Sequence, residues 1–193
     1  MVLPRSVPAR RGLLSAALTL SALIALTGCT AVTTAVGIAP VPSDASQLTE
    51  DDGYIPDGAS LTLDSDLPAI QRLDPQLLEA LRAADSVAVE ERGTTITIVD
   101  GWRSLRYQEY LFARAVQKYG SEHEAERWVK RGADSSHVSG QAVDIGTADA
   151  MDFLSRFGSE WGICQTYANE AWHFELATDP GGECPAMEAD GRG

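Results

Sequence analysis

Two segments of the chain carry side chains that are suited to binding a divalent metal ion. His137 and Asp144 lie in one stretch, and His173 lies closer to the C-terminus. Two imidazoles and a carboxylate can ligate zinc, and a catalytic zinc site commonly has three protein ligands and keeps its fourth position for water. Glu170 shortly precedes His173, where it is expected to take a proton from that water. These residue types and their order predict a zinc hydrolase.

The ligands can meet only if the chain turns between them. Gly140 lies between His137 and Asp144 and is the residue type that permits a tight turn. Asp144 lies in an apolar stretch, and a buried carboxylate must be paired or bind a metal, so an ion pair with an arginine is the alternative. Glu170 and His173 are an odd number of residues apart, and a regular strand would separate them. A bend near Glu170 is therefore required.

The elements that position these residues follow from apolar periodicity, helix caps and glycines. Four helices are expected, over residues 75–92, 105–119, 121–130 and 149–157. Four strands are expected, over residues 94–99, 142–145, 163–168 and 171–176. The stretch 132–140 is expected to be a loop. This mixture predicts an α+β fold, with one small antiparallel sheet flanked by helices in a single domain.

The N-terminus has the features of an export signal. Arg5, Arg10 and Arg11 precede an uncharged run over residues 13–26, which is short for a membrane span. The run ends in Leu-Thr-Gly-Cys, which resembles the lipobox of bacterial lipoproteins. We therefore expect lipidation of Cys29 and anchoring at the outer face of the bacterial cytoplasmic membrane. An ordinary secretory signal with a chance cysteine is the alternative.

The remaining composition sets the expected domain boundaries. A signal peptide is expected over residues 1–28 and a flexible tether over residues 29–66, where prolines and acids occur without periodicity. The folded domain that carries the predicted zinc site is expected over residues 67–187, followed by a disordered tail over residues 188–193. The net charge of −13 disfavours nucleic-acid binding, because such a surface repels phosphates.

Two cysteines remain if Cys29 is lipidated. Export would place Cys164 and Cys184 in an oxidising compartment, where we expect them to form a disulfide. The bond would close a loop in the chain and stabilise the fold by roughly 3 kcal/mol. A pair of metal-binding thiols is the weaker alternative, because the spacing matches no zinc-finger pattern.

Three motifs resemble those of the peptidase M15 family, which comprises zinc D-alanyl-D-alanine carboxypeptidases and dipeptidases and includes the VanY-type enzymes. Their order along the chain is that of the family. The motifs are Gly101-Trp102-Arg103-Ser104 with Gln108, Ser135-x-His137-x-x-Gly140-x-Ala142-x-Asp144, and Glu170-x-Trp172-His173. Trp102 replaces the usual tyrosine of the first motif, and Ala171 replaces a common proline of the third. Neither change removes a catalytic group.

The resemblance implies an enzyme that acts on the D-Ala-D-Ala end of peptidoglycan stem peptides. We expect the protein to be a monomer. It implies these roles: zinc ligands His137, Asp144 and His173; general base and later acid Glu170; substrate-binding or polarising Arg103; supporting hydrogen-bonding residues Gln108 and Ser135. Three alternatives remain open. The same zinc site could serve a D,D-dipeptidase or an L-Ala-D-Glu-type endopeptidase, or the domain could be a zinc module that binds cell wall without catalysis.

Overall fold

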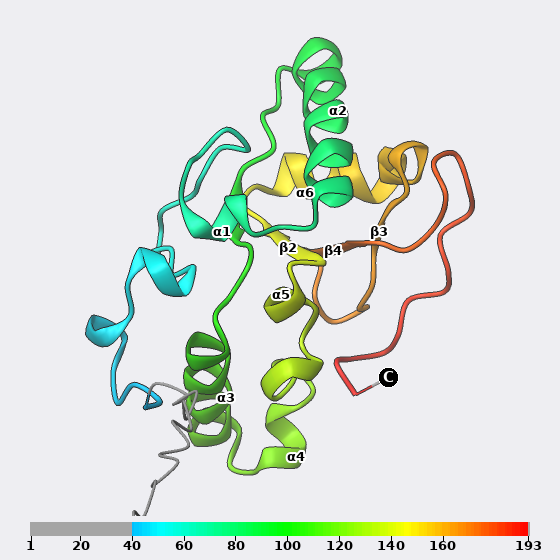
Figure 1. Ribbon diagram of the computed structural model, residues 1–193. Coiled ribbons are helices and arrows are strands. Elements are labelled where there is room, and N and C mark those ends of the chain that lie inside the picture. Colours follow the sequence, from blue (N-terminus) through cyan, green and yellow to red (C-terminus); the bar gives the residue numbers. More distant parts are fainter. Residues whose placement is uncertain (1–39, 193) are drawn as a thin grey trace, which may run out of the picture. The chain divides into compact units, whose positions relative to one another are not determined.

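The computed structural model describes residues 40–192 (Figure 1). The expected signal peptide and the expected lipidation of Cys29 lie outside these residues. None of the helices over residues 40–192 is long and apolar enough to cross a membrane. The α-helices are α1 (Pro68–Gln71), α2 (Pro75–Arg92), α3 (Leu105–Tyr119), α4 (Glu122–Ala125), α5 (Ser136–Ser139) and α6 (Ala148–Phe157). The 3-10 helices are η1 (Ala45–Gln47), η2 (Glu50–Asp52), η3 (Gly132–Asp134) and η4 (Gly158–Trp161).

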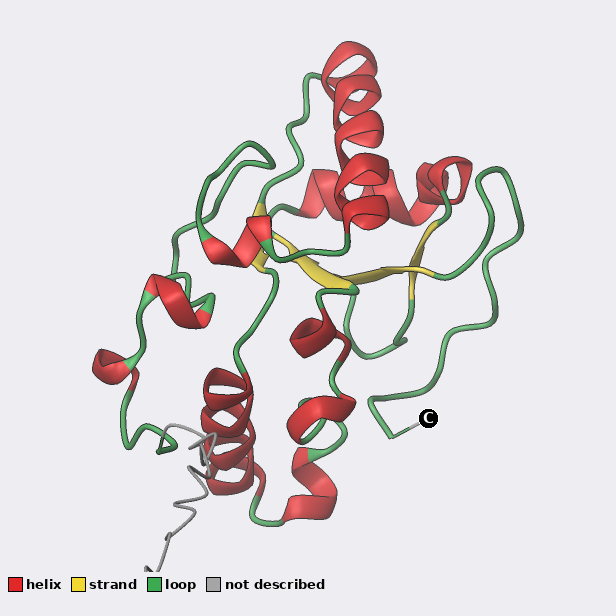
Figure 2. Ribbon diagram, in the orientation of Figure 1, coloured by secondary structure: helices red, strands yellow, loops and turns green. Residues whose placement is uncertain are grey.

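One four-stranded antiparallel sheet forms the centre of the fold, in the order β1-β2-β4-β3. The strands are β1 (Ile98–Asp100), β2 (Ala142–Ile145), β3 (Ile163–Gln165) and β4 (His173–Leu176). Figure 2 shows helices on both sides of this sheet. The register places Asp144 of β2 opposite His173 of β4 and opposite Asp100 of β1. The predicted α+β fold is confirmed, and the pairing brings two of the predicted ligands together.

The larger hydrophobic core lies where α2 and α6 pack against the sheet (Figure 1). Helix α2 begins as predicted, because the Asp74 carboxylate accepts hydrogen bonds from the N–H groups of Gln76 and Leu77. It ends at Gly93, which has a φ of 64° that suits glycine. The core contains fully buried leucine, isoleucine and phenylalanine side chains, each of which stabilises the fold by roughly 2 kcal/mol.

A second, smaller cluster forms between α3 and α4 around Phe112, Ala115 and Ala125. Helix α3 has the predicted bounds, and its Ser104 hydroxyl accepts a hydrogen bond from the Tyr107 N–H. Helix α4 ends at Ala125, several residues before the predicted end. Residues 128–130, which follow the shorter helix, line the cavity described below.

The segment 132–140, predicted as a loop, contains the short helix α5. Gly140 ends this helix with a φ of 78°, and a Cβ atom at this position would lie 2.3 Å from the Arg72 carbonyl oxygen. The turn at Gly140 was therefore predicted correctly, but the helix before it was not. A single helical turn has too few residues to show apolar periodicity.

Strand β1 is shorter than the predicted 94–99 because the residues before it find other partners. The Ile96 N–H donates to the Asp85 carboxylate at 2.7 Å, and the Thr97 carbonyl accepts from Gly146. Local β-propensity predicted an extended conformation here, whereas strand pairing depends on contacts with distant residues.

The expected tether over residues 29–66 needs a correction, because its later part packs on the domain. Leu48, Ile55 and Leu63 are buried. Asp52 of η2 forms an ion pair with Arg106 of α3 at 2.5 Å. These apolar residues are spaced without period, so the sequence pattern did not reveal that they are buried.

The expected disorder over residues 188–193 is also wrong for residues 188–192. Glu188 bridges to Tyr167 in parallel orientation, and Asp190 is only 6% exposed. Arg127 and Arg192 both bind the Asp190 carboxylate, at 3.0 and 2.8 Å. The tail is polar but ordered, because its charges are paired within the domain.

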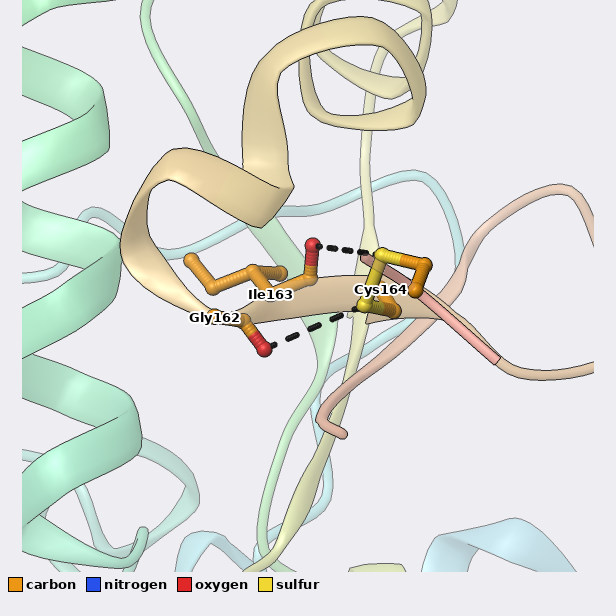
Figure 3. The surroundings of a disulfide bond; sticks show 4 residues. Gly162, Ile163 and Cys164 are labelled. Atoms are coloured by element: carbon orange, nitrogen blue, oxygen red, sulfur yellow. Dashed lines mark hydrogen bonds between the residues drawn. A yellow bond between two sulfur atoms is a disulfide. The ribbon is translucent and has the colours of Figure 1, made fainter. Parts of the chain in front are cut away.

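The predicted disulfide between Cys164 and Cys184 is present, with Cα atoms 5.8 Å apart (Figure 3). It joins β3 to the segment that leads into the tail. The two sulfur atoms lie 4.0 and 3.9 Å from the carbonyl oxygens of Gly162 and Ile163. The disulfide therefore sits against the backbone of the edge strand, close to the sheet.

Candidate metal centre

Three secondary-structure elements bring the predicted ligands to one point. His137 lies on α5, Asp144 on β2, and His173 at the start of β4. His137 Nε2 is 3.2 Å from His173 Nδ1, and the Asp144 carboxylate oxygen Oδ1 lies 3.4 Å from the first nitrogen and 3.2 Å from the second. All three side chains are buried. The predicted cluster is confirmed as a set of converging donor atoms.

The spacing of these donors suits a tetrahedral ion. Ligand atoms about 2.0–2.1 Å from a zinc ion in tetrahedral geometry lie about 3.3 Å from one another. The three observed separations are 3.2, 3.2 and 3.4 Å. Lone pairs of two imidazoles and a carboxylate that converge on one point repel each other unless a cation lies among them. The donor set therefore fits zinc, and all three donor residues line the cavity described below.

The outer ring nitrogens of both histidines are held by other groups. His137 Nδ1 lies 2.8 Å from the Gly101 carbonyl oxygen, and His173 Nε2 lies 2.8 Å from Glu175 Oε1. The Ser136 hydroxyl donates to the same glutamate oxygen at 2.7 Å. Such contacts select the tautomer whose inner nitrogen carries the free lone pair, and they fix the orientation of the ring.

Neither Glu175 nor Ser136 received a role from the sequence. The available signal was the spacing of His173 and Glu175, which are two residues apart on one strand and so share a face. Ser136 showed no comparable signal, because it reaches Glu175 only through the packing of α5 against β2, which pairs with β4.

Arg103 connects the metal ligands to the end of β1. Its guanidinium donates to Asp100 at 2.8 Å, to Asp144 at 3.0 Å and to the Gln108 side-chain oxygen at 3.1 Å. Burial alone would lower the pKa of Arg103, but Asp100 and Asp144 outweigh it and raise the pKa above its ordinary value. Arg103 is therefore a permanent cation.

Asp144 uses both of its carboxylate oxygens. One oxygen faces the histidines and the other accepts a hydrogen bond from Arg103. The two roles that the sequence allowed for Asp144, metal ligand and ion-pair partner of an arginine, are therefore compatible. Burial alone would raise the pKa of this carboxyl, but His137, His173 and Arg103 outweigh burial and hold the pKa well below its ordinary range. Asp144 is thus a carboxylate, as metal ligation requires.

Glu170 lies in the turn before β4, so the bend predicted between Glu170 and His173 is present. Its carboxylate is 3.9 Å from His173 Nδ1, and the residue is only 6% exposed. Burial raises the pKa of Glu170 to about 7, although the neighbouring His173 opposes the shift. A carboxyl group that titrates near neutrality can both accept and return a proton.

A cavity of about 190 Å³ opens beside the donor cluster. Arg103, Gln108, Ser135, Trp128, Lys130 and Trp172 are among the residues that line it. The Gln108 amide is engaged at both ends, by Arg103 and by the Lys130 carbonyl oxygen, so it supports these two residues. The third histidine of the chain, His123, lies outside the cavity and contacts Arg192.

Three converging metal donors, a buried carboxyl with a pKa near 7 and an open cavity define the class: this is a metallohydrolase site built on an α+β fold. Residues 71–160 match the family model of VanY, described as D-alanyl-D-alanine carboxypeptidase. This part of the chain, which holds two of the three metal donors, is therefore similar to that family.

Solved structures show the same fold. A Zn(II) complex of a mutant of the vancomycin-resistance D,D-pentapeptidase VanY, from a VanB-type cassette, is 20% identical, with a TM-score of 0.51 over 61% of this chain and 77% of that chain. VanYB in complex with D-alanine-D-alanine is also 20% identical, with a TM-score of 0.51 over 63% of this chain and 80% of that chain. A search of curated proteins finds no match.

Proposed function

We propose that the chain is a zinc D,D-carboxypeptidase that hydrolyses the terminal D-Ala-D-Ala bond of peptidoglycan stem peptides. The observation that carries this proposal is the position of Glu170, a buried carboxyl with a pKa of about 7 that lies 3.9 Å from a donor atom of the metal cluster. A structural metal site has no use for a titrating base beside it. The family match and the likeness to a VanYB structure with bound D-alanine-D-alanine support the choice of substrate.

His137, Asp144 and His173 would hold a zinc ion, which would supply Lewis-acid chemistry by polarising the scissile carbonyl and acidifying water. Glu170 accepts the proton of the attacking water and then delivers it to the nitrogen of the leaving D-alanine. Both steps need a pKa near the working pH, which burial of Glu170 provides.

Arg103 contributes a fixed positive charge next to the reacting carbonyl. Three of its N–H groups bind Asp100, Gln108 and Asp144, which leaves two of the five guanidinium donors for the cavity. We assign these to the carbonyl oxygen as it gains negative charge. Ser135 is buried at the cavity wall, where we assign it a supporting contact with the peptide.

The test is digestion of defined muropeptides by zinc-loaded protein, followed by mass spectrometry. We expect release of single D-alanine from a stem pentapeptide, no release with a chelator, and a 10²- to 10⁴-fold loss of kcat in Glu170→Gln, the usual contribution of a general base. Cleavage only of free D-Ala-D-Ala would indicate a dipeptidase, and cleavage within the stem an endopeptidase. Tight binding without turnover would indicate a non-catalytic wall-binding module.

We also propose that the enzyme works as a monomer anchored through lipid at Cys29 outside the cytoplasmic membrane, next to its substrate. This rests on the basic, apolar and Leu-Thr-Gly-Cys segments of the N-terminus. Fatty-acid labelling of the full chain tests it, and Cys29→Ala should abolish the label and release the protein from membranes. A label that survives this substitution would contradict the proposed anchor.

A further inference from the structure

The cavity beside the metal centre is lined by two cationic side chains, Arg103 and Lys130. The charge of Arg103 is balanced within the protein, because Asp100 and Asp144 lie 2.8 and 3.0 Å from its guanidinium. Lys130 makes no ion pair within 4.0 Å among residues 40–192. Lys130 is therefore the cation of this cavity without an ion-pair partner, and the more distant carboxylates of Glu188 and Glu175 also act on its charge.

Lys130 is held in place from two sides. Its backbone carbonyl accepts a hydrogen bond from the Gln108 amide, whose oxygen in turn accepts from Arg103. Its ammonium nitrogen lies over the Tyr167 ring, 5.4 Å from the centroid. The half-buried side chain is thus directed by an aromatic surface, and its backbone is tied to the residue that binds Asp144.

Lys130 and the metal centre are close enough for the end of a peptide to contact both. The Tyr167 and His173 ring centroids are 5.0 Å apart and Lys130 Nζ lies 5.4 Å from the Tyr167 centroid, so Nζ lies at most about 10 Å from the centre of the His173 ring. One extended residue spans about 3.5 Å. With a metal–oxygen contact of about 2 Å and an N–O contact of about 2.8 Å, a bridge of one residue reaches about 8 Å and a bridge of two reaches about 12 Å, so the last one or two residues of a peptide can span this distance.

We infer that Lys130 binds the free C-terminal carboxylate of the peptide whose last bond is cleaved, and so makes this site specific for chain ends. The inference rests on the proposed function and adds the residue that selects a terminus over an internal bond. A charge-assisted hydrogen bond of this kind corresponds to roughly a 10- to 100-fold difference in affinity.

The chain offers a matched control. Its two lysines are Lys118 and Lys130, and both place the ammonium over a tyrosine ring. Lys118 Nζ lies 4.9 Å from the Tyr119 centroid and does not line the cavity. Lys118→Met therefore removes the same charge and the same aromatic contact at a distance from the metal centre.

The experiment measures peptide binding to zinc-loaded Glu170→Gln protein, in which the peptide stays intact. Calorimetry compares a stem pentapeptide that ends in a free acid with its C-terminal amide, using lysine at the third position. We expect the acid to bind roughly 10- to 100-fold more tightly than the amide. Adding Lys130→Met should abolish this preference, Lys130→Arg should restore most of it, and Lys118→Met should leave it unchanged.

Two results would overturn the inference while the proposed function stands. The first is equal binding of acid and amide by the Glu170→Gln protein, which needs no Lys130 variant. The second is an unchanged preference after Lys130→Met. If the protein binds neither peptide and cleaves none, the proposed function fails, and the role of Lys130 fails with it.

Discussion

Glu175 is expected to control how tightly the metal is bound, although it does not touch the metal position. Its Oε1 atom lies 2.8 Å from His173 Nε2 and accepts from Ser136 at 2.7 Å. Burial alone would raise the pKa of Glu175, but His173 and Ser136 outweigh it and lower the pKa. A full negative charge therefore faces His173, which orients the ring and makes its inner nitrogen a stronger donor.

Removing such a partner costs about 10- to 100-fold in metal affinity. The Glu175 side chain is 21% exposed, so solvent screens part of its charge. We therefore expect Glu175→Ala to weaken zinc binding by about 10- to 30-fold, or about 1.4–2 kcal/mol. Glu175→Gln, which keeps an acceptor oxygen but loses the charge, should have a smaller effect.

Competition with a chromophoric chelator measures the zinc affinity of each variant directly. Glu90→Gln is the control, because Glu90 is an exposed residue of α2 and loses the same charge. Catalysis at saturating zinc should fall less than affinity does, since the reacting groups remain. Wild-type zinc affinity in Glu175→Ala would refute the reasoning.

Three further predictions concern stability. Burial raises the pKa of Glu170 to about 7 from 4.5, so its favourable contribution is present in full below pH 4.5 and is lost as the pH rises through 7. With the metal removed by a chelator, the unfolding free energy of Glu170→Gln relative to wild type should therefore rise by up to about 3 kcal/mol between about pH 5 and pH 8, as measured by thermal unfolding. A difference in unfolding free energy that does not change with pH would contradict this. Replacing Cys164 and Cys184 with serine should lower the unfolding free energy by about 3 kcal/mol in urea titrations, and an unchanged value would show that the bond does not restrain the unfolded chain. Leu81→Ala, at a fully buried position, should cost roughly 3 kcal/mol, and a cost within the error of urea unfolding would mean that the site collapses around the smaller side chain.

Local chemistry explains which elements could be predicted. The Asp74 and Ser104 caps act within one helical turn, and the glycines at 93 and 120 end helices through their own φ angles. These features need no distant partner, so helices α2 and α3 were predicted with their correct bounds. Strand β2 was also predicted with its correct bounds. The other three strands were located but drawn too long, because a strand exists only where another pairs with it.

The candidate site divides in the same way. His137, Asp144 and His173 could be predicted because their residue types are rare together and their motifs resemble a known family. Lys130 could not, since its importance depends on Tyr167 and on the pairing of Arg103 with two carboxylates. Which cation of the cavity lacks an ion-pair partner is decided by the folded structure, and no spacing in the sequence encodes it.

The tail adds a part of the site that composition alone had assigned to disorder. Gly191 lines the cavity, and its N–H donates to the Arg127 carbonyl oxygen at 3.1 Å. Polar residues in a short terminal segment are typical of disorder. Here the Asp190 carboxylate, bound by Arg127 and Arg192, gives the segment a fixed position.

The disulfide between Cys164 and Cys184 means that the position of the C-terminal segment depends on an oxidation step. It attaches the edge of the sheet to the segment that ends at the cavity wall. A reduced chain has all the metal ligands but lacks the disulfide that fixes this segment at the cavity wall. Formation of this bond needs an oxidant, so the wall of the cavity reaches its final covalent form only after a redox reaction.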